Sequence, residues 1–248
     1  METLLKVGRC KGQKMKLSIV IPAYNEEKRI KTTLEQLVAR FKSCEIVVVS
    51  ESTDKTNQIV RDFQKTAPLL KLVTSSKRLG KGGAFKKGAA YATGEVVLLL
   101  DSDLPILLSD VENIVASING ADVAVASREI EGTRIVVYPP LARVFAGKVY
   151  AKLVNILFSL RVKDPQCGCK AFRRTVIARV LPAVESTGFE FDTELLFRCK
   201  VMGYSIKEVP VNWSYKPDSK LSLFEDTVSM GKGVLKLWLK SHVATRKN

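Results

Sequence analysis

The chain has 248 residues, of which 46% are hydrophobic and 26% are charged. This composition excludes a disordered or fibrous chain and predicts a globular protein, and the length suits one large α/β domain with a full core. Forty lysines and arginines against 25 acidic residues give a net charge of +15, which predicts an anionic partner: nucleic acid, an anionic membrane surface or a phosphorylated small molecule.

Cysteine and histidine restrict the chemistry. The cysteines are odd in number and have no disulfide-framework spacing, which suits a reducing compartment: Cys10, Cys44, Cys167, Cys169 and Cys199. The single histidine, His242, argues against His-based triads and His-rich zinc sites. No run approaches the roughly 20 apolar residues that span a bilayer, and residues 1–16 lack the apolar centre of a signal peptide. We therefore expect a cytosolic location.

Short apolar runs predict five strands in the first half of the chain, over residues 17–24, 45–50, 71–76, 95–103 and 122–128. Apolar and polar residues do not alternate cleanly in these runs, which is typical of strands buried on both faces of a parallel sheet. Helical patterns lie between them, beginning after the N-cap Asn25, behind the capping cluster 52–54, at Ala84 and at the capping box Ser109-x-x-Glu112. This βαβαβαβαβ order predicts right-handed crossovers and a ligand site at the carboxyl ends of the strands.

The second half starts at the Pro139-Pro140 break. It predicts a long helix over about 141–160, a turn-rich segment from Asp164, a helix over 191–203, a strand over 206–213 and a C-terminal helix that opens with the capping box Ser222-x-x-Glu225. One domain with a C-terminal elaboration is the economical division. The boundaries are 1–15 for a basic N-terminal extension, 16–221 for the main domain, and 222–248 for an amphipathic basic helix and tail.

Two carboxylates follow the most hydrophobic strand, at Asp101 and Asp103. Side chains alternate along an extended backbone, so both point to the same side. Carboxylate oxygens at this position can hold Mg²⁺ or Mn²⁺ against a diphosphate. The other interpretation is that these residues only cap a turn.

A glycine-rich segment over 78–83 joins the third strand to its helix. It offers flexible backbone, two cations and a helix N-terminus, which together suit a phosphate group. It matches neither a Walker A loop nor GxGxxG, and an ordinary glycine-rich connection is the alternative.

These motifs, in their order and spacing, resemble the nucleotide-sugar-binding half of the family 2 glycosyltransferases: PAYNE (22–26), STD (52–54), RLGKGGAFKKG (78–88) and DSD (101–103). The resemblance continues through ASR (126–128), DPQCGCKAFRR (164–174), FDTELL (191–196) and VPVNWSYKPDSKL (209–221). The combination is most similar to the dolichyl-phosphate glucosyltransferase branch, with the dolichyl-phosphate mannose synthases next, and it covers nearly all of residues 16–225. It implies a GT-A fold, with a Rossmann-like, mostly parallel sheet flanked by helices.

The resemblance also implies a donor site for a nucleotide-sugar. It places these residues there: Pro22, Ala23, Tyr24, Glu26, Glu51, Lys81, Asp101, Ser102 and Asp103. Lys81 approaches the base or a phosphate, and Asp101 and Asp103 hold Mg²⁺ or Mn²⁺ at the diphosphate, where a cation neutralises the departing charge. Glu51 replaces the base-contacting carboxylate, because Val49-Ser50-Glu51 stands where the family shows an Asp pair and Gly. Uridine and guanosine both stay open.

On the acceptor side, the resemblance implies dolichyl or polyprenyl phosphate, whose phosphate should face Arg128, Lys170 and Arg134. The phosphate oxygen is already ionised, so no general base is required. Asp192 lies where relatives with hydroxyl acceptors carry their base, and we interpret it here as an orienting carboxylate or as a helix cap. We expect Asp103, Arg128 and Asp192 to act in catalysis. Pro105 stands where the mannosyl branch tends to carry Gln, which weakens the mannosyl assignment.

Two segments could contact a membrane. In the C-terminal helix Phe224, Val228, Leu235 and Trp238 share one face, flanked by Lys232, Lys236 and Lys240, a pattern typical of helices at an anionic surface. The 141–160 segment has a similar character. We expect 141–160 to pack on the sheet and 222–240 to contact the membrane. Cys167 and Cys169 are expected to be buried thiols, because no second cysteine pair completes a metal site.

Taken together, the resemblance implies an inverting, metal-dependent hexosyltransferase, which we expect to be peripheral on the cytosolic face of a membrane. It would transfer glucose from UDP-glucose, or mannose from GDP-mannose, to dolichyl or polyprenyl phosphate. One alternative keeps the fold but uses a soluble or other lipid hydroxyl acceptor, with Asp192 as base. The other alternative is a nucleic-acid-binding protein. Two observations argue against it: the motifs gather at strand ends, and no RNA or DNA module is recognisable. Nucleic acid is therefore not an expected partner.

Overall fold

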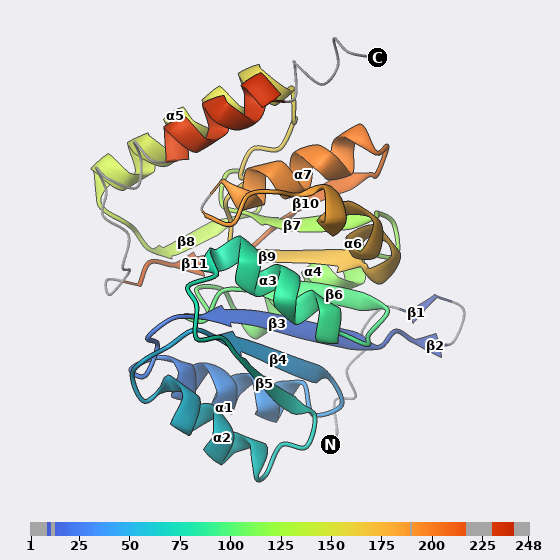
Figure 1. The fold of residues 1–248 in the computed structure, drawn as a ribbon. Coiled ribbons are helices and arrows are strands. Elements are labelled where there is room, and N and C mark those ends of the chain that lie inside the picture. Colours follow the sequence, from blue (N-terminus) through green and yellow to red (C-terminus); the bar gives the residue numbers. More distant parts are fainter. Residues whose placement is uncertain (1–8, 11–12, 189, 217–229, 241–248) are drawn as a thin grey trace.

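A computed structural model of the chain describes residues 9–10, 13–188, 190–216 and 230–240 (Figure 1). Its centre is a seven-stranded sheet in the order β10-β7-β9-β6-β3-β4-β5. The strands are β3 (Leu17–Ala23), β4 (Glu45–Ser50), β5 (Leu70–Thr74), β6 (Val96–Leu100), β7 (Val123–Ser127), β9 (Cys169–Arg173) and β10 (Ile206–Pro210). Only β9 runs antiparallel to its neighbours β6 and β7, so the predicted mostly parallel α/β sheet is confirmed.

Helices cover both faces of this sheet (Figure 1). They are α1 (Ile30–Arg40), α2 (Thr56–Gln64), α3 (Gly80–Tyr91), α4 (Leu108–Ser117), α5 (Leu141–Phe158), α6 (Arg174–Val180) and α7 (Phe191–Val201), with a 3-10 turn at Leu181–Ala183 and a helix over 230–240. Two small sheets complete the fold: β1 (Arg9–Cys10) with β2 (Gln13–Lys14), and β8 (Arg134–Val137) with β11 (Asn212–Ser214).

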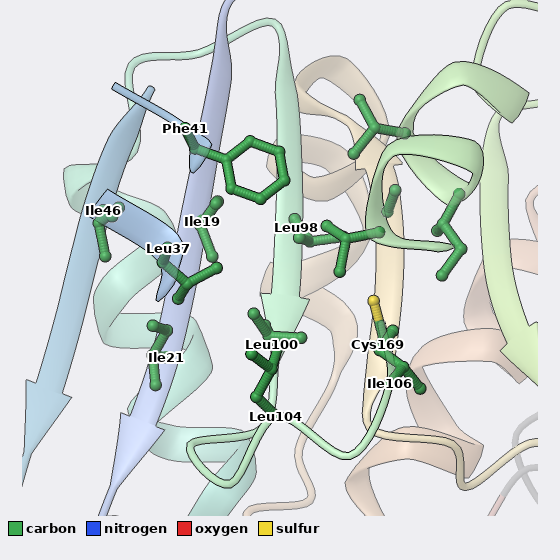
Figure 2. Packing of buried hydrophobic residues seen from close by; sticks show 14 of the residues in the cluster. Ile19, Ile21, Leu37, Phe41, Ile46, Leu98, Leu100, Leu104, Ile106 and Cys169 are labelled. Carbon is green, nitrogen blue, oxygen red and sulfur yellow. The ribbon is translucent and has the colours of Figure 1, made fainter. Parts of the chain in front are cut away.

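The two faces of the sheet bury separate apolar cores. Ile19 and Leu98 point to the core beneath α1, α2 and α4, which Figure 2 shows around Leu37 and Phe41. Their neighbours point to the other core, with α3, α5, α6, α7 and residues 230–240. This explains the continuous apolar runs of the sequence, because both faces of each central strand are buried. Gly88 lets α3 approach β3, since a Cβ there would collide with Val20.

Two predicted helix starts are wrong. Asn25 has a φ of +53° and lies five residues before α1, because its side chain accepts a hydrogen bond from the Thr53 backbone at 2.8 Å instead of capping the helix. The Ser109-x-x-Glu112 box does not form, because α4 begins at Leu108 without a side-chain cap and Glu112 pairs with Arg40 at 2.7 Å. Both polar groups were taken by partners far away in the sequence.

The helix over 230–240 corrects another expectation. Its buried residues are Val234 and Leu237, with Trp238 partly buried against the same core, whereas Leu235 is exposed. Leu235 and Trp238 therefore do not share one exposed face. The capping box at Ser222 and Glu225, and the apolar positions Phe224 and Val228, lie outside the described residues. Among the described residues, no helix is long and apolar enough to cross a membrane.

Candidate active site

The predicted site residues converge where β3, β4, β6 and β7 end. Tyr24, Glu51, Asp101 and Arg128 each follow the last residue of one of these strands, and parallel strands bring their carboxyl ends to the same edge of the sheet. Ligand sites of open α/β sheets lie at this edge. The sequence placed these residues correctly relative to the strands.

The loops after β3 and β4 are joined by hydrogen bonds. The Asn25 backbone donates to Ser52 Oγ at 2.8 Å, and the Glu26 backbone donates to Thr56 Oγ1 at 2.8 Å. The Glu26 carboxylate, itself buried, pairs with Arg29. These bonds hold the PAYNE segment in one conformation, with Ala23 buried and Tyr24 at the surface of the site.

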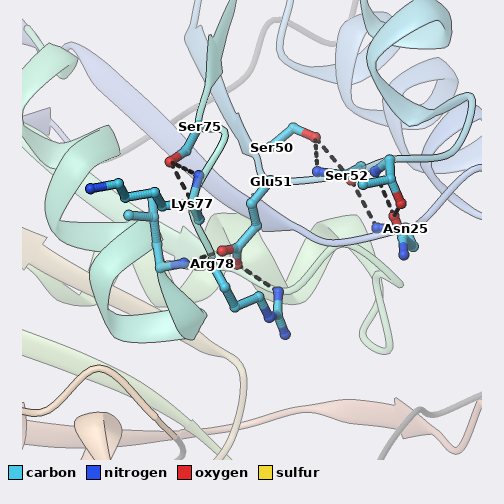
Figure 3. A network of polar contacts seen from close by, with 9 residues as sticks. Asn25, Ser50, Glu51, Ser52, Ser75, Lys77 and Arg78 are labelled. Atoms are coloured by element: carbon cyan, nitrogen blue, oxygen red, sulfur yellow. Dashed lines mark hydrogen bonds and ion pairs between the residues drawn. The ribbon is translucent and has the colours of Figure 1, made fainter.

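Glu51 lies at the bottom of this half of the site. It is buried, its Oε1 accepts a hydrogen bond from Arg78 at 2.7 Å, and its other oxygen accepts one from the Leu79 backbone (Figure 3). The Arg78 guanidinium also lies 3.4 Å above the centre of the Tyr24 ring, an arrangement typical of a cation–π contact. Glu51 therefore binds the start of the glycine-rich loop and places Arg78 over the aromatic ring.

The acidic pair follows β6. Burial and the neighbouring charge of Asp101 raise the pKa of Asp103 to about 6. Gly168 leaves room for the Asp101 carboxylate, because a Cβ there would overlap it. Ser102 is nearly buried, and its carbonyl accepts a hydrogen bond from Thr33 Oγ1 at 2.7 Å, which ties the pair to α1.

The acidic pair fits Mg²⁺ or Mn²⁺ by the chemistry of its oxygens. No group of three or more His, Cys, Asp or Glu side chains forms a metal site in the described part of the chain. Mg²⁺ bound near phosphates commonly takes one or two carboxylates and fills its other positions with phosphate oxygens and water. Asp101 and Asp103 are such a pair, and both line the same cavity.

Three further charges lie behind the acidic pair. Lys81 Nζ is 3.0 Å from Asp101 Oδ1 and 3.0 Å from Asp192 Oδ2, and Lys170 Nζ is 2.6 Å from Asp192 Oδ1. Burial alone would raise the pKa of Asp192, but the charges of Lys170 and Lys81 hold it below its ordinary value. Asp192 is therefore a buried carboxylate between two ammonium groups, in the first turn of α7 and not at its N-cap.

The three predicted acceptor cations lie in different surroundings. Arg128 forms a two-pronged pair with Asp164 at 2.7 and 2.8 Å and lines the cavity. Arg134 is exposed on β8 and does not line it. Lys170 has no exposed surface, and its amine contacts Asp192 and the Cys167 carbonyl. Lys170 does not line the cavity in the ligand-free structure, but its partner Asp192 does, so contact between Lys170 and the acceptor phosphate stays a prediction.

A cavity of about 690 Å³ lies between α5 and this edge of the sheet. Acidic groups line it at Asp101, Asp103 and Asp192. Sequence reasoning missed most of its other walls, which come from α5, the segment around Lys163 and the β11 region: Arg143, Val144, Lys148, Ala151, Lys152, Lys163, Trp213, Tyr215 and Lys216. The usable signal was the presence of Arg143, Lys148 and Lys152 among apolar and small residues in 141–152.

Cys167 and Cys169 are buried, as predicted. Burial raises the pKa of Cys167 to about 12, so the thiol stays protonated and inert. Both side chains belong to the core around β9.

Comparisons with known proteins agree with this geometry. Residues 18–181 match the Glycosyl transferase family 2. Over 223 residues the chain is 32% identical to a dolichyl-phosphate beta-glucosyltransferase, ALG5C, of Trichomonas vaginalis, covering 83% of this chain and 66% of that one. It is 30% identical to the dolichyl-phosphate beta-glucosyltransferase of Saccharomyces cerevisiae, covering 88% and 73%. It is also 30% identical to the glycosyltransferase AglD of Haloferax volcanii, covering 94% of this chain but only 38% of AglD.

Solved structures give the same fold at lower identity. Glucosyl-3-phosphoglycerate synthase from Mycobacterium tuberculosis with UDP superposes with a TM-score of 0.69 at 19% identity, covering 91% of this chain and 79% of that one. Mannosyl-3-phosphoglycerate synthase from Rubrobacter xylanophilus gives a TM-score of 0.67 at 16% identity, covering 92% and 74%. The chain therefore belongs to glycosyl transferase family 2 and has the GT-A fold.

Proposed function

We propose that this chain transfers a hexose to the phosphate of a polyprenyl phosphate such as dolichyl phosphate. The favoured donor is UDP-glucose, and GDP-mannose is the second candidate. The observation that carries the proposal is the cavity beneath α5, where the acidic pair and Arg128 meet walls that are both apolar and basic. Relatives named dolichyl-phosphate beta-glucosyltransferase support it. Family membership favours an enzyme over the nucleic-acid-binding alternative.

In this reaction an acceptor phosphate oxygen forms a bond to the anomeric carbon while the bond from that carbon to the diphosphate breaks. A divalent cation held by Asp101 and Asp103 would neutralise charge on the departing diphosphate. Inversion follows from attack on the face opposite the leaving group. The oxygen is already ionised, so no side chain has to remove a proton. Arg128, fixed by Asp164, lines the cavity in a position to bind the acceptor phosphate.

The surroundings of Asp192 bear on the choice between a phosphate acceptor and a hydroxyl acceptor. A general base must be free to accept a proton and needs a pKa near the working pH. Asp192 is buried, pairs with Lys81 and Lys170, and has a pKa below its ordinary value. These features favour a positioning role and disfavour the alternative with Asp192 as base.

The test is transfer from radiolabelled UDP-glucose and GDP-mannose, with Mn²⁺, to three acceptors: a polyprenyl phosphate, 3-phosphoglycerate and an alkyl glycoside. The proposal expects label to enter the organic phase with the polyprenyl phosphate, with the larger rate from UDP-glucose. Transfer to 3-phosphoglycerate or to the glycoside, with none to the polyprenyl phosphate, would reject it.

Filling the cavity should block the acceptor and spare the donor. Ala151 lines the cavity from α5, so the Ala151→Trp side chain would occupy space that the proposal assigns to the first isoprene units. We expect kcat/KM for polyprenyl phosphate to fall about tenfold or more, the size expected when positioning is disturbed, while UDP affinity by calorimetry is unchanged. Ala142→Trp is the matched control, because Ala142 is exposed on the same helix outside the cavity.

We also propose that the α5 side of the molecule docks on a membrane. As expected, α5 packs on the core, but only with one face: Tyr150, Val154 and Phe158 are buried, while its other face exposes Leu141, Phe145, Val149 and Ile156. In helix 230–240, Leu235 and Leu239 are exposed beside Lys232 and Lys236. Met230 of that helix lines the same cavity as α5. Exposed apolar side chains beside lysines are typical of helices that lie on anionic lipid.

Charge reversal tests this docking. Each lysine near an anionic surface contributes about 1 kcal/mol, so the Lys232→Glu, Lys236→Glu variant should lose tenfold or more of its binding to anionic liposomes in sedimentation. Lys240 is left intact because it pairs with Glu185 at 2.5 Å. The matched control is the Lys31→Glu, Lys65→Glu variant. Lys31 lies in α1 and Lys65 at the end of α2, and both are exposed and distant in sequence from helix 230–240. Equal losses in both variants would contradict a specific docking face.

A further inference from the structure

One oxygen of the acidic pair already has a cation beside it. Lys81 Nζ lies 3.0 Å from Asp101 Oδ1, at the distance of a charge-assisted hydrogen bond. Asp103, by contrast, has only Arg29 at 3.9 Å among its ion pairs in the described residues. The two carboxylates that fit a divalent cation are therefore not equivalent in the ligand-free protein.

Lys81 is held in this position from both sides. Its second partner is Asp192 at 3.0 Å, which is buried and is itself held by Lys170 at 2.6 Å. Lys81 is the second residue of α3, so its backbone is fixed by the helix, and only 17% of its side chain is exposed. The ammonium is thus a fixed charge beside Asp101 and not a mobile surface group.

A fixed ammonium has opposite effects on two ligands. A divalent cation on Asp101 would lie within a few ångström of Lys81, and like charges at that distance repel strongly in a partly buried site. A diphosphate would bring negative charge that Lys81 can bind by hydrogen bonds. Diphosphate binding would therefore remove the obstacle that Lys81 presents to the metal.

We propose that Lys81 is the resident counter-cation of Asp101 and makes divalent-cation binding depend on the nucleotide diphosphate; this inference rests on the proposed donor site. Lys81 competes with the metal when the site is empty and stabilises both ligands when the diphosphate is present. Because coupling between two ligands is reciprocal, the metal must raise diphosphate affinity by the same factor.

The first measurement uses no nucleotide. Mn²⁺ is titrated into the full chain, and free Mn²⁺ is followed by electron paramagnetic resonance. We expect Lys81→Met to bind Mn²⁺ about tenfold more tightly than the unmodified protein, because the competing charge is gone. Lys87→Met should behave like the unmodified protein, since Lys87 lies on the same helix but bonds to the Thr74 carbonyl. Equal or weaker Mn²⁺ binding by Lys81→Met overturns the proposal.

The second measurement repeats the titration with saturating UDP. We expect UDP to strengthen Mn²⁺ binding more in the unmodified protein than in Lys81→Met, and an equal gain in both overturns the proposal. Thermal melting checks that Lys81→Met is folded. If Lys81→Met does not fold, Lys81→Gln is used in its place, because glutamine keeps a hydrogen-bond donor for Asp192. Failure of the unmodified protein to bind UDP would reject the donor site, whereas the nucleotide-free comparison still decides the role of Lys81.

Discussion

Asp103→Asn is expected to lower kcat/KM for hexose transfer about 10³-fold, the size expected when an electrostatic contact to the leaving group is lost. Asparagine keeps the shape but removes the charge that would hold a divalent cation. The ligand-free fold should be unharmed, because Asp103 lies at the end of a strand, repels Asp101 and is partly buried. Its melting temperature should be unchanged or slightly raised. Steady-state kinetics with Mn²⁺ and thermal melting measure the two effects separately.

Asp62→Asn provides the control for Asp103→Asn. Asp62 is an exposed carboxylate of α2 that pairs with Lys65 at 2.7 Å, away from the strand ends. It should leave kcat/KM unchanged. Full transfer by Asp103→Asn, with Mn²⁺ present and the protein folded, would show that the acidic pair is not the metal site.

The parts of the fold that were predicted correctly are those that local sequence determines. Continuous runs of Val, Ile and Leu identified β3, β4, β6 and β7, because a strand buried on both faces has no polar alternation. The residues that follow those strands were then placed at one edge by topology alone. Asp101 and Glu51 needed no further information to be placed at the same edge of the sheet.

The parts that were missed depend on contacts between distant segments. The antiparallel strand β9 was described only as turn-rich, because its pairing with β6 and β7 is set by the sheet and not by its own residues. The Asn25 side chain bonds to a loop 28 residues away, so a local capping rule failed. The motif around Lys170 predicted a cation near the acceptor, and only the structure places that cation beneath Asp192. Which face of α5 is buried likewise follows from its packing partners.

Lys170→Met is expected to lower the free energy of unfolding by about 3–5 kcal/mol, the cost of leaving one partner of a buried ion pair without its counter-charge. Lys170 has no exposed surface and supplies the 2.6 Å contact to Asp192, so its loss leaves that carboxylate with Lys81 alone. Urea unfolding followed by circular dichroism measures the change. Lys207→Met, at an exposed lysine of β10 in the same sheet, is the control and should unfold like the unmodified protein.

A second substitution separates charge from packing at this position. In the double variant Lys170→Met, Asp192→Asn the uncompensated carboxylate is gone, so we expect it to be more stable than Lys170→Met alone; coupling of this kind is typical of residues in direct contact. If packing of the lysine stem were the main contribution to stability, Asp192→Asn would lower the free energy of unfolding further, in addition to the loss caused by Lys170→Met. A double variant less stable than Lys170→Met would therefore show that Lys170 acts through its volume, and that Lys81 alone neutralises Asp192.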